Sequence, residues 1–308
     1  MLAYLAVRTL QSVMTILLAA IAVFTAVRLT PGDPAELLLP RGASPDQVAA
    51  LRASWGLDDP FPSQLSAYLG NLIQGNLGES VSYREPVLLV IQERLPATLQ
   101  LATAAMVFAL VLAIPLGIIS ALRPGSILDQ LITNFTLLTQ SVPSFWLGVQ
   151  LILIFSLWLR WLPPSGADGP KYLILPMITL SADVTALMTR VVRTEMVSVL
   201  RQDYIRTARG KGLSARTVHF RHAFRNAANP LITVIGLRWG ALLGGAAITE
   251  TVFGWPGIGR LAIQSVAARD YPLIQGIVLV AAVIFVTLNL LVDVVYAWLV
   301  PRVRLGGA

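Results

Sequence analysis

Six apolar runs constrain this chain more than any other feature, because each is long enough to cross a lipid bilayer. They lie near residues 9–29, 96–122, 130–159, 172–197, 229–252 and 272–299. A helix needs about 20 apolar residues to span the hydrocarbon core. Only 13% of the residues are charged and 56% are hydrophobic, whereas soluble domains carry about 25% charged residues. We therefore predict an all-α integral membrane protein with six transmembrane helices.

Two of these runs have features of their own. The third is too long for one perpendicular helix and contains Pro143, which predicts a tilt or a kink at that residue. The first follows a single arginine, Arg8, as the apolar part of a signal peptide would. Its length and the lack of a small-x-small cleavage site before Pro31 indicate a retained helix instead.

Basic residues set the expected orientation in the membrane. Nine of the 23 Lys and Arg residues lie between Arg190 and Arg225, and cytoplasmic loops carry such an excess of positive charge. The net charge of +7 therefore reflects membrane orientation rather than nucleic-acid binding. We expect both termini in the cytoplasm. The chain then divides into 1–29 (N-terminus and first helix), 30–95 (external subdomain), 96–299 (five helices with a cytoplasmic loop at 198–228) and 300–308 (cytoplasmic tail).

The external segment has helix signals but few chemically reactive residues. Ser44 is expected to cap a helix that has Pro45 at its first position, runs to about Trp55 and stops at Gly56. A second helix is expected over residues 62–74. The segment contains no Cys and no His, so we expect a small subdomain or lid rather than an independent catalytic domain.

The basic stretch contains a pattern of its own. A short helix around Ile205 should end in a left-handed cap at Gly212, and Ser214 should cap a second helix. On that second helix Phe220, Phe224 and Ala227 are expected to share one apolar stripe. An ordinary basic loop that fixes topology would explain the charge. It would not explain two capped helices, which favour a docking surface.

The same stretch resembles the cytoplasmic signature of the dipeptide/oligopeptide-type ABC importer permeases. The resemblance rests on Asp203-Tyr204-Ile205-Arg206-Thr207-Ala208-Arg209-x-Lys211-Gly212-Leu213 and on His222-x-x-Arg225-Asn226-Ala227-x-x-Pro230. Further matches along the chain are Pro31-Gly32-Asp33-Pro34, Gly56-Leu57-Asp58-x-Pro60, Gly75-x-Leu77-Gly78, Ile174-Leu175-Pro176, Glu250-x-Val252-Phe253-x-Trp255-Pro256-Gly257-Ile258-Gly259, Asp270-Tyr271-Pro272, Asn289-Leu290-x-x-Asp293-x-x-Tyr296 and Pro301-Arg302. Two positions depart from the family pattern: Gly210 replaces the usual Ala, and Val300 replaces the usual Asp.

The resemblance implies the type I ABC importer permease fold and a B-type transmembrane subunit in the bacterial inner membrane. Its implied partners are a second homologous permease, two cytoplasmic ATP-binding subunits and an external solute-binding protein. The implied ATPase contact consists of Tyr204, Ile205, Ala208, Arg209, Lys211 and Gly212. The implied external gate and binding-protein contact consists of Phe253, Trp255 and Pro256. No cofactor and no nucleic acid are implied for this chain.

The residues agree that this chain is not itself the ATPase. Its two lysines, Lys171 and Lys211, precede Tyr172 and Gly212, so neither forms the Lys-Ser/Thr step of a phosphate-binding loop. ATP would be bound by partner subunits. The only histidines, His219 and His222, lie among arginines without a nearby carboxylate, and we predict no metal site there.

Charged or small residues inside the spans are candidates for lining a solute path. These are Asp183, Arg238, Gly244 and Gly245. Intramembrane charges are functional candidates by default, although a structural ion pair is an alternative for Asp183 and Arg238. Close helix packing is the alternative for the glycines. For Glu250 and Asp293, near span ends, packing or interfacial roles are favoured.

Three classes of function compete for this sequence. An ABC permease subunit is favoured. A secondary transporter would show internal sequence repeats and an ion site inside the membrane. A membrane enzyme would show a set of catalytic His, Asp, Glu or Ser residues at one depth in the membrane. The cargo expected from the resemblance is a di- or oligopeptide. Glutathione, a nickel chelate or another small solute are alternatives within the same family, because the binding protein selects the cargo.

Overall fold

The computed structural model describes residues 2–29, 44–54, 56 and 58–299, and the regular elements in this part of the chain are helices. They are α1 (Leu2–Leu29), α3 (Pro45–Ser54), α4 (Phe61–Ile73), α5 (Val87–Leu122), α6 (Ile127–Ser141), α7 (Ser144–Leu151), the π-helix η1 (Ile152–Trp158), α8 (Pro170–Leu200), α9 (Asp203–Gly210), the π-helix η2 (Thr217–Phe224), α10 (Arg225–Val252), α11 (Ile258–Ala268) and α12 (Tyr271–Leu299).

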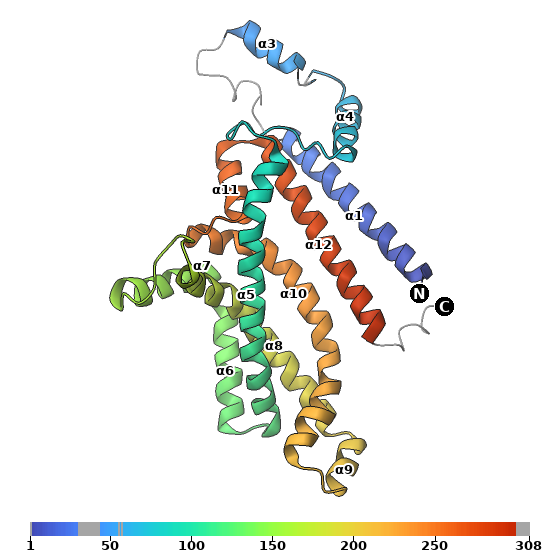
Figure 1. Cartoon of the computed structure of the whole chain (residues 1–308), viewed down its shortest axis with the longest axis vertical. Helices are drawn as coiled ribbons and strands as arrows, with labels where there is room; N and C mark the ends of the chain where they lie inside the picture. Colours follow the sequence, from blue (N-terminus) through green and yellow to red (C-terminus); the bar gives the residue numbers. More distant parts are fainter. Residues whose placement is uncertain (1, 30–43, 55, 57, 300–308) are drawn as a thin grey trace.

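Long apolar helices form the membrane bundle, as the hydropathy predicts. Within the described residues, α1, α5, α8 and α12 are each long and apolar enough to cross a bilayer. Two bent helix pairs bring the number of possible spans to six. Figure 1 shows α3 and α4 at one end of the long axis and α9 at the other. The expected six-span architecture is therefore the one observed.

The predicted kink at Pro143 is a complete break. Helices α6 and α7 meet at an angle of 102°, and the second of them, followed by η1, projects sideways from the bundle (Figure 1). Pro143 has no N–H to continue α6, and it pushes the preceding Val142 into an extended conformation (φ −92°, ψ 123°). The break leaves the C-terminal end of α6 beside the middle of the bundle.

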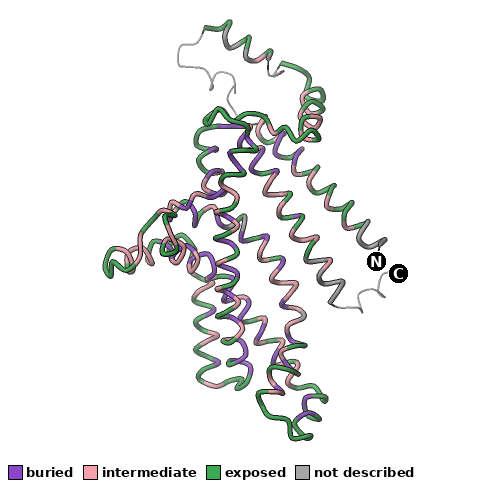
Figure 2. Tube along the Cα trace, viewed as in Figure 1, coloured by how far each residue is buried: buried purple, intermediate pink, exposed green. Residues whose placement is uncertain are grey.

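The core lies where α5 packs along α8. Small residues permit a close approach there: a Cβ on Gly117 would lie 2.6 Å from Cβ of Val192. Ala105, Ala109 and Met188 are buried in the same cluster, and Figure 2 shows the buried residues concentrated on these central helices. The large exposed apolar side chains of the outer helices, many of them on α1 and α6, are suited to lipid.

The two helices of the segment that is expected to be external begin close to the predicted residues. Helix α3 starts at Pro45, α4 covers Phe61–Ile73, and Gly56 has the positive φ (+60°) of a helix stop. An aromatic contact joins α4 to the first span, because Phe24 stacks on Tyr68 with ring centroids 4.9 Å apart. The predictions that concern Trp55, Leu57, residues 31–34 and the tail 300–308 lie outside the described residues.

Two features of the helices differ from the sequence expectation. Helix α5 begins at Val87 rather than near Pro96, so the proline lies inside the helix. Packing against neighbouring helices accommodates prolines inside membrane helices. Helix α11 was not predicted, because its 11 residues are too short to register as a span.

Surface labelling tests the topology. The chain has no cysteine, so single cysteines at Ser44 and Ser214, both exposed, report their own positions. An impermeant thiol reagent should label Ser44→Cys from outside intact cells and Ser214→Cys only after the cytoplasmic face is opened. Labelling of both from the same face would contradict the topology.

Candidate coupling element, external corner and mid-span pocket

The end of the molecule that is expected to face the cytoplasm carries a short helix with a defined stop. Helix α9 ends at Gly210, and Gly212 adopts φ +75°. The N–H of Gly212 donates to the Arg209 carbonyl at 2.9 Å, and the N–H of Leu213 donates to the Ala208 carbonyl at 3.4 Å. These two bonds form a Schellman cap, whose left-handed position favours glycine. The left-handed stop at Gly212 was predicted correctly.

The second helix of this element starts where the sequence predicts, but its apolar face differs. Ser214 Oγ accepts a hydrogen bond from the N–H of Thr217 at 3.3 Å, as an N-cap residue does. The expected stripe is wrong at Phe220, whose side chain is 54% exposed. Val218 and Ala223 are buried instead. Their spacing of five residues matches the wider π-helical turn, which a 3.6-residue period does not anticipate.

The expected ATPase contact divides into an inner and an outer face. Ile205 and Ala208 are buried within the chain's own hydrophobic core, so these two anchor α9 rather than face a partner. Tyr204, Arg209 and Lys211 are exposed. Gly212 is exposed as well, and a Cβ there would meet nothing within 4 Å. We call residues 203–224 the cytoplasmic element.

Exposed cations dominate the outer face of the cytoplasmic element and its junction with α10. They are Arg206, Arg209, Lys211, Arg216, Arg221 and Arg225. Burial, and then the positive charge of Arg209, lower the pKa of His219 below its usual range. The described residues contain no group of three or more His, Cys, Asp or Glu arranged to hold a metal ion.

At the external end, a buried carboxylate fixes the corner between α10 and α11. Glu250 is fully buried. One carboxylate oxygen accepts from the Thr98 hydroxyl at 2.6 Å and the other from the N–H of Arg260 at 2.9 Å. The carboxylate thus satisfies the free N-terminal donors of α11. A Cβ on Gly257 would overlap this carboxylate, which explains a glycine at that position. Glu250 therefore has a packing role, as the sequence favoured.

The two aromatic residues of the expected external gate, Phe253 and Trp255, are packed inside this corner, and their role as a gate stays a prediction. Phe253 and Trp255 are only 1% and 3% exposed. Trp255 donates from Nε1 to the Ala97 carbonyl of α5 at 2.9 Å, so it joins the corner to the central helix. Pro256 alone of the three remains partly exposed, beside a cavity of about 220 Å³ that Arg94 and Arg260 also line.

The structure brings two of the predicted path residues together at mid-span. Asp183 of α8 and Arg238 of α10 form an ion pair with a nitrogen–oxygen distance of 3.3 Å. They line a cavity of about 300 Å³ together with residues from the break between α6 and α7, among them Thr139, Gln140 and Ser144. The two residues thus form an ion pair and also line a cavity, so each of the two roles weighed for them from the sequence has a structural counterpart here.

The candidate glycines of α10 do not all share one environment. Gly240 packs closely, since a Cβ there would lie 2.6 Å from the Phe285 ring. Gly244 is exposed, with nothing within 4 Å of an added Cβ, so it remains available to line a path. The side-chain surroundings of Gly245 and Asp293 lie outside the described residues.

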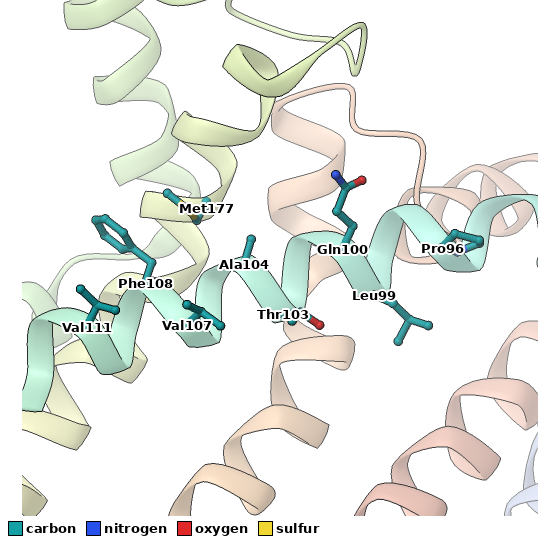
Figure 3. A pocket seen from close by; sticks show the side chains of 9 residues that line it. All are labelled: Pro96, Leu99, Gln100, Thr103, Ala104, Val107, Phe108, Val111 and Met177. Atoms are coloured by element: carbon teal, nitrogen blue, oxygen red, sulfur yellow. The ribbon is translucent and has the colours of Figure 1, made fainter.

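Sequence reasoning missed two features of this region. The first is an apolar groove of about 830 Å³ along α5, to which α8 contributes Met177 (Figure 3). The second is an ion pair in which Arg193 of α8 donates to both oxygens of the buried Asp129 of α6 at 2.6 and 2.7 Å. Asp129 lies at the start of the third apolar run and Arg193 near the end of the fourth. Opposite charges at these ends of two consecutive, antiparallel spans are the sequence signal that would have predicted the pair.

Comparison with known proteins covers the whole length of this chain. The family "Binding-protein-dependent transport system inner membrane component" matches residues 113–305, and its N-terminal companion matches residues 1–102. The glutathione transport system permease protein GsiC of Escherichia coli O6:H1 (strain CFT073) is 42% identical over 304 residues, 99% of each chain. The di/tripeptide transport system permease protein DppB of Pseudomonas aeruginosa (strain UCBPP-PA14) is 41% identical over 310 residues, 91% of this chain and 92% of that one.

Solved structures support the fold. An inward-facing structure of the MetNI methionine ABC transporter matches with a TM-score of 0.60 and 16% sequence identity, covering 69% of this chain and 97% of that one. A second crystal form of the same transporter gives a TM-score of 0.55. The family match spans more than half of the chain. Membership of this family implies ATPase and binding-protein partners. This chain belongs to the binding-protein-dependent transport system inner membrane component family and is an inner-membrane permease subunit of an ABC importer, whose ATP is hydrolysed by separate subunits.

Proposed function

We propose that this chain forms half of the translocation path for di- or oligopeptides, glutathione included, delivered by an external solute-binding protein. A second homologous permease forms the other half, and two ATP-binding subunits dock on the cytoplasmic face. The substrate class is inferred from relatives whose names specify glutathione and di/tripeptides. Each of those solutes carries a free ammonium group and at least one free carboxylate.

One observation carries the proposal: the cytoplasmic element presents exposed cations on a helix that is anchored from behind. Ile205 and Ala208 belong to the same buried cluster as Val192 and Met196 of α8. A push on the exposed face of α9 is therefore transmitted into α8 through packed side chains rather than absorbed by a loose loop. This is what ATP-driven closure of a partner subunit requires for alternating access.

The apolar groove on α5 supports the second permease as a partner. Its lining is almost wholly apolar and includes Leu99, Val107 and Val111, while Gln100 and Thr103 add polar groups to the same face (Figure 3). Polar groups on an exposed face inside a membrane favour contact with protein or water over lipid. A homologous subunit packed beside this face would cover the apolar part and leave the polar part for the path.

Co-purification and reconstitution test the proposed function together. The tagged chain should be isolated with one further permease and two ATPase subunits, countable by native mass spectrometry. In proteoliposomes the complex should take up radiolabelled alanyl-alanine or glutathione only with ATP and the binding protein present. Uptake of these peptides driven by an ion gradient, by a chain that purifies without an ATPase, would instead identify a secondary transporter.

A further inference from the structure

The ion pair between Asp183 and Arg238 is in an unusual place for a structural pair. Both residues lie near the middle of their helices, Pro170–Leu200 and Arg225–Val252. Yet the side chain of Asp183 is 59% exposed and that of Arg238 is 38% exposed. Charged groups at this depth are costly in lipid and face protein or a water-filled cavity. The exposed side of this pair therefore faces the path or a polar partner surface.

A second ion pair in the same chain shows what a structural pair looks like. Arg193 holds Asp129 through two short bonds, and the Asp129 side chain is only 4% exposed. Ser120 and the N–H of Gly125 donate to the same carboxylate. Asp183 and Arg238, in contrast, share a single bond of 3.3 Å. Among the described residues, that bond is the only polar contact recorded for either side chain.

The surroundings of the exposed pair are polar on one side. The cavity of about 300 Å³ beside it is lined by Thr139 and Gln140 at the end of α6 and by Ser144 at the start of α7. The C-terminal end of a helix carries partial negative charge, which favours a cation nearby. The 102° break at Pro143 is what brings this end of α6 to mid-span.

We propose that Asp183 and Arg238 form a transient binding subsite for the two charged termini of a small zwitterionic peptide. Asp183, which lines the same cavity as the end of α6, receives the ammonium group, and Arg238 receives the carboxylate, for which its planar donor pair is suited. The peptide then replaces one weak, solvent-exposed ion pair with two. The proposal rests on the proposed function, because it requires that this chain lines the path.

The weakness of the pair is the property that suits it to transport. A solute site in a path must bind favourably enough for entry but weakly enough for release. The Asp129–Arg193 pair, whose carboxylate is buried and fully bonded, could not open without leaving Asp129 as an unpaired buried charge. The cavity is at the lower end of the range for small-molecule sites, about 300–1,000 Å³.

The test is uptake by the reconstituted importer, with alanyl-alanine and glutathione as probes. Three variants of this chain are compared: Asp183→Asn, Arg238→Gln and the double variant. Each single change removes a charge-assisted bond to the solute and should lower uptake by about 10–100-fold. The double variant should be at least as impaired as the worse single variant. Assembly and ATP hydrolysis stimulated by the binding protein should persist in all three.

A merely structural pair gives the opposite pattern. There the single variants leave an unpaired charge, and the double variant removes that charge and recovers uptake. Recovery to the wild-type rate would overturn the subsite and leave the proposed function intact. Loss of assembly in the double variant would also overturn it, in favour of a contact with the second permease. If the wild-type importer takes up neither peptide, the proposed function itself fails.

A matched control separates the subsite from general loss of charge. Arg190 is an exposed cation on the same helix as Asp183, and it does not line the cavity. Arg190→Gln should leave uptake of both peptides within about twofold of wild type, because Arg190 does not line the cavity beside the ion pair. An equal loss in Arg190→Gln and Arg238→Gln would contradict a specific site at Arg238.

Discussion

Gly212→Val should abolish ATP-driven uptake while the chain still inserts in the membrane. Gly212 has φ +75°, a conformation that costs L-residues about 1–2 kcal/mol and β-branched residues more. An added Cβ would meet no atom within 4 Å, so the main effect is conformational rather than steric. Relief of the strain must break the Schellman bonds that orient α9. The measurements are peptide uptake and stimulated ATP hydrolysis in proteoliposomes.

A neighbouring glycine supplies the control for this change. Gly210 also has open space around an added Cβ, but it has helical backbone and no positive φ. Gly210→Ala should preserve uptake and stabilise α9 slightly, by up to about 1 kcal/mol. Transport equal to wild type in Gly212→Val, with normal stimulation of hydrolysis, would leave the coupling role of the cytoplasmic element without support.

Trp255→Ala should destabilise the protein before it affects any solute contact. Removing a buried tryptophan costs about 3–5 kcal/mol, and the Ala97 carbonyl loses its bond to the indole. We expect the apparent melting temperature in detergent to fall by roughly 5–15 °C. Uptake at low temperature should then follow the amount of folded protein. Thermal unfolding followed by fluorescence-detected size exclusion measures the effect.

Two variants separate packing from hydrogen bonding and from the gating alternative. Trp255→Phe retains most of the ring volume and removes the hydrogen bond, so it should cost only about 0.5–1.5 kcal/mol. Trp158 is 76% exposed, and Trp158→Ala should leave the melting temperature nearly unchanged. A Trp255→Ala protein with unaltered melting temperature and sharply reduced uptake would restore a direct gating role for this residue.

The buried Glu250 gives a further reason to expect that substitutions in this corner destabilise the protein. Its carboxylate caps α11 and bonds to Thr98 of α5, while Trp255 bonds to Ala97 one residue away along α5. Both contacts hold the α10–α11 corner against the same turn of the central helix. The corner is therefore fastened to α5 at two adjacent residues, and Pro256 is the partly exposed member of the expected gate.

Local sequence patterns determined much of this structure because they depend on neighbouring residues alone. Apolar runs of about 20 residues can satisfy their backbone in lipid only as helices, so the spans followed from hydropathy. The stops at Gly212 and Gly56, the cap at Ser214 and the break at Pro143 follow from backbone geometry that is specific to these residue types. The family resemblance could also be read from the sequence, because each of its motifs consists of residues that are close together in the chain.

Tertiary packing decided which of the marked residues are exposed. Sequence alone could not reveal that Trp255 and Ile205 are buried, because their burial depends on helices distant in the chain. The π-turns of η2 changed the apolar face from Phe220 to Val218 and Ala223, a shift that no fixed helical period predicts. Asp183 and Arg238 were each marked from sequence, but only the packing of α8 against α10 made them a pair. Pairing between distant segments is a property of three-dimensional contact, and a single sequence carries no direct record of it.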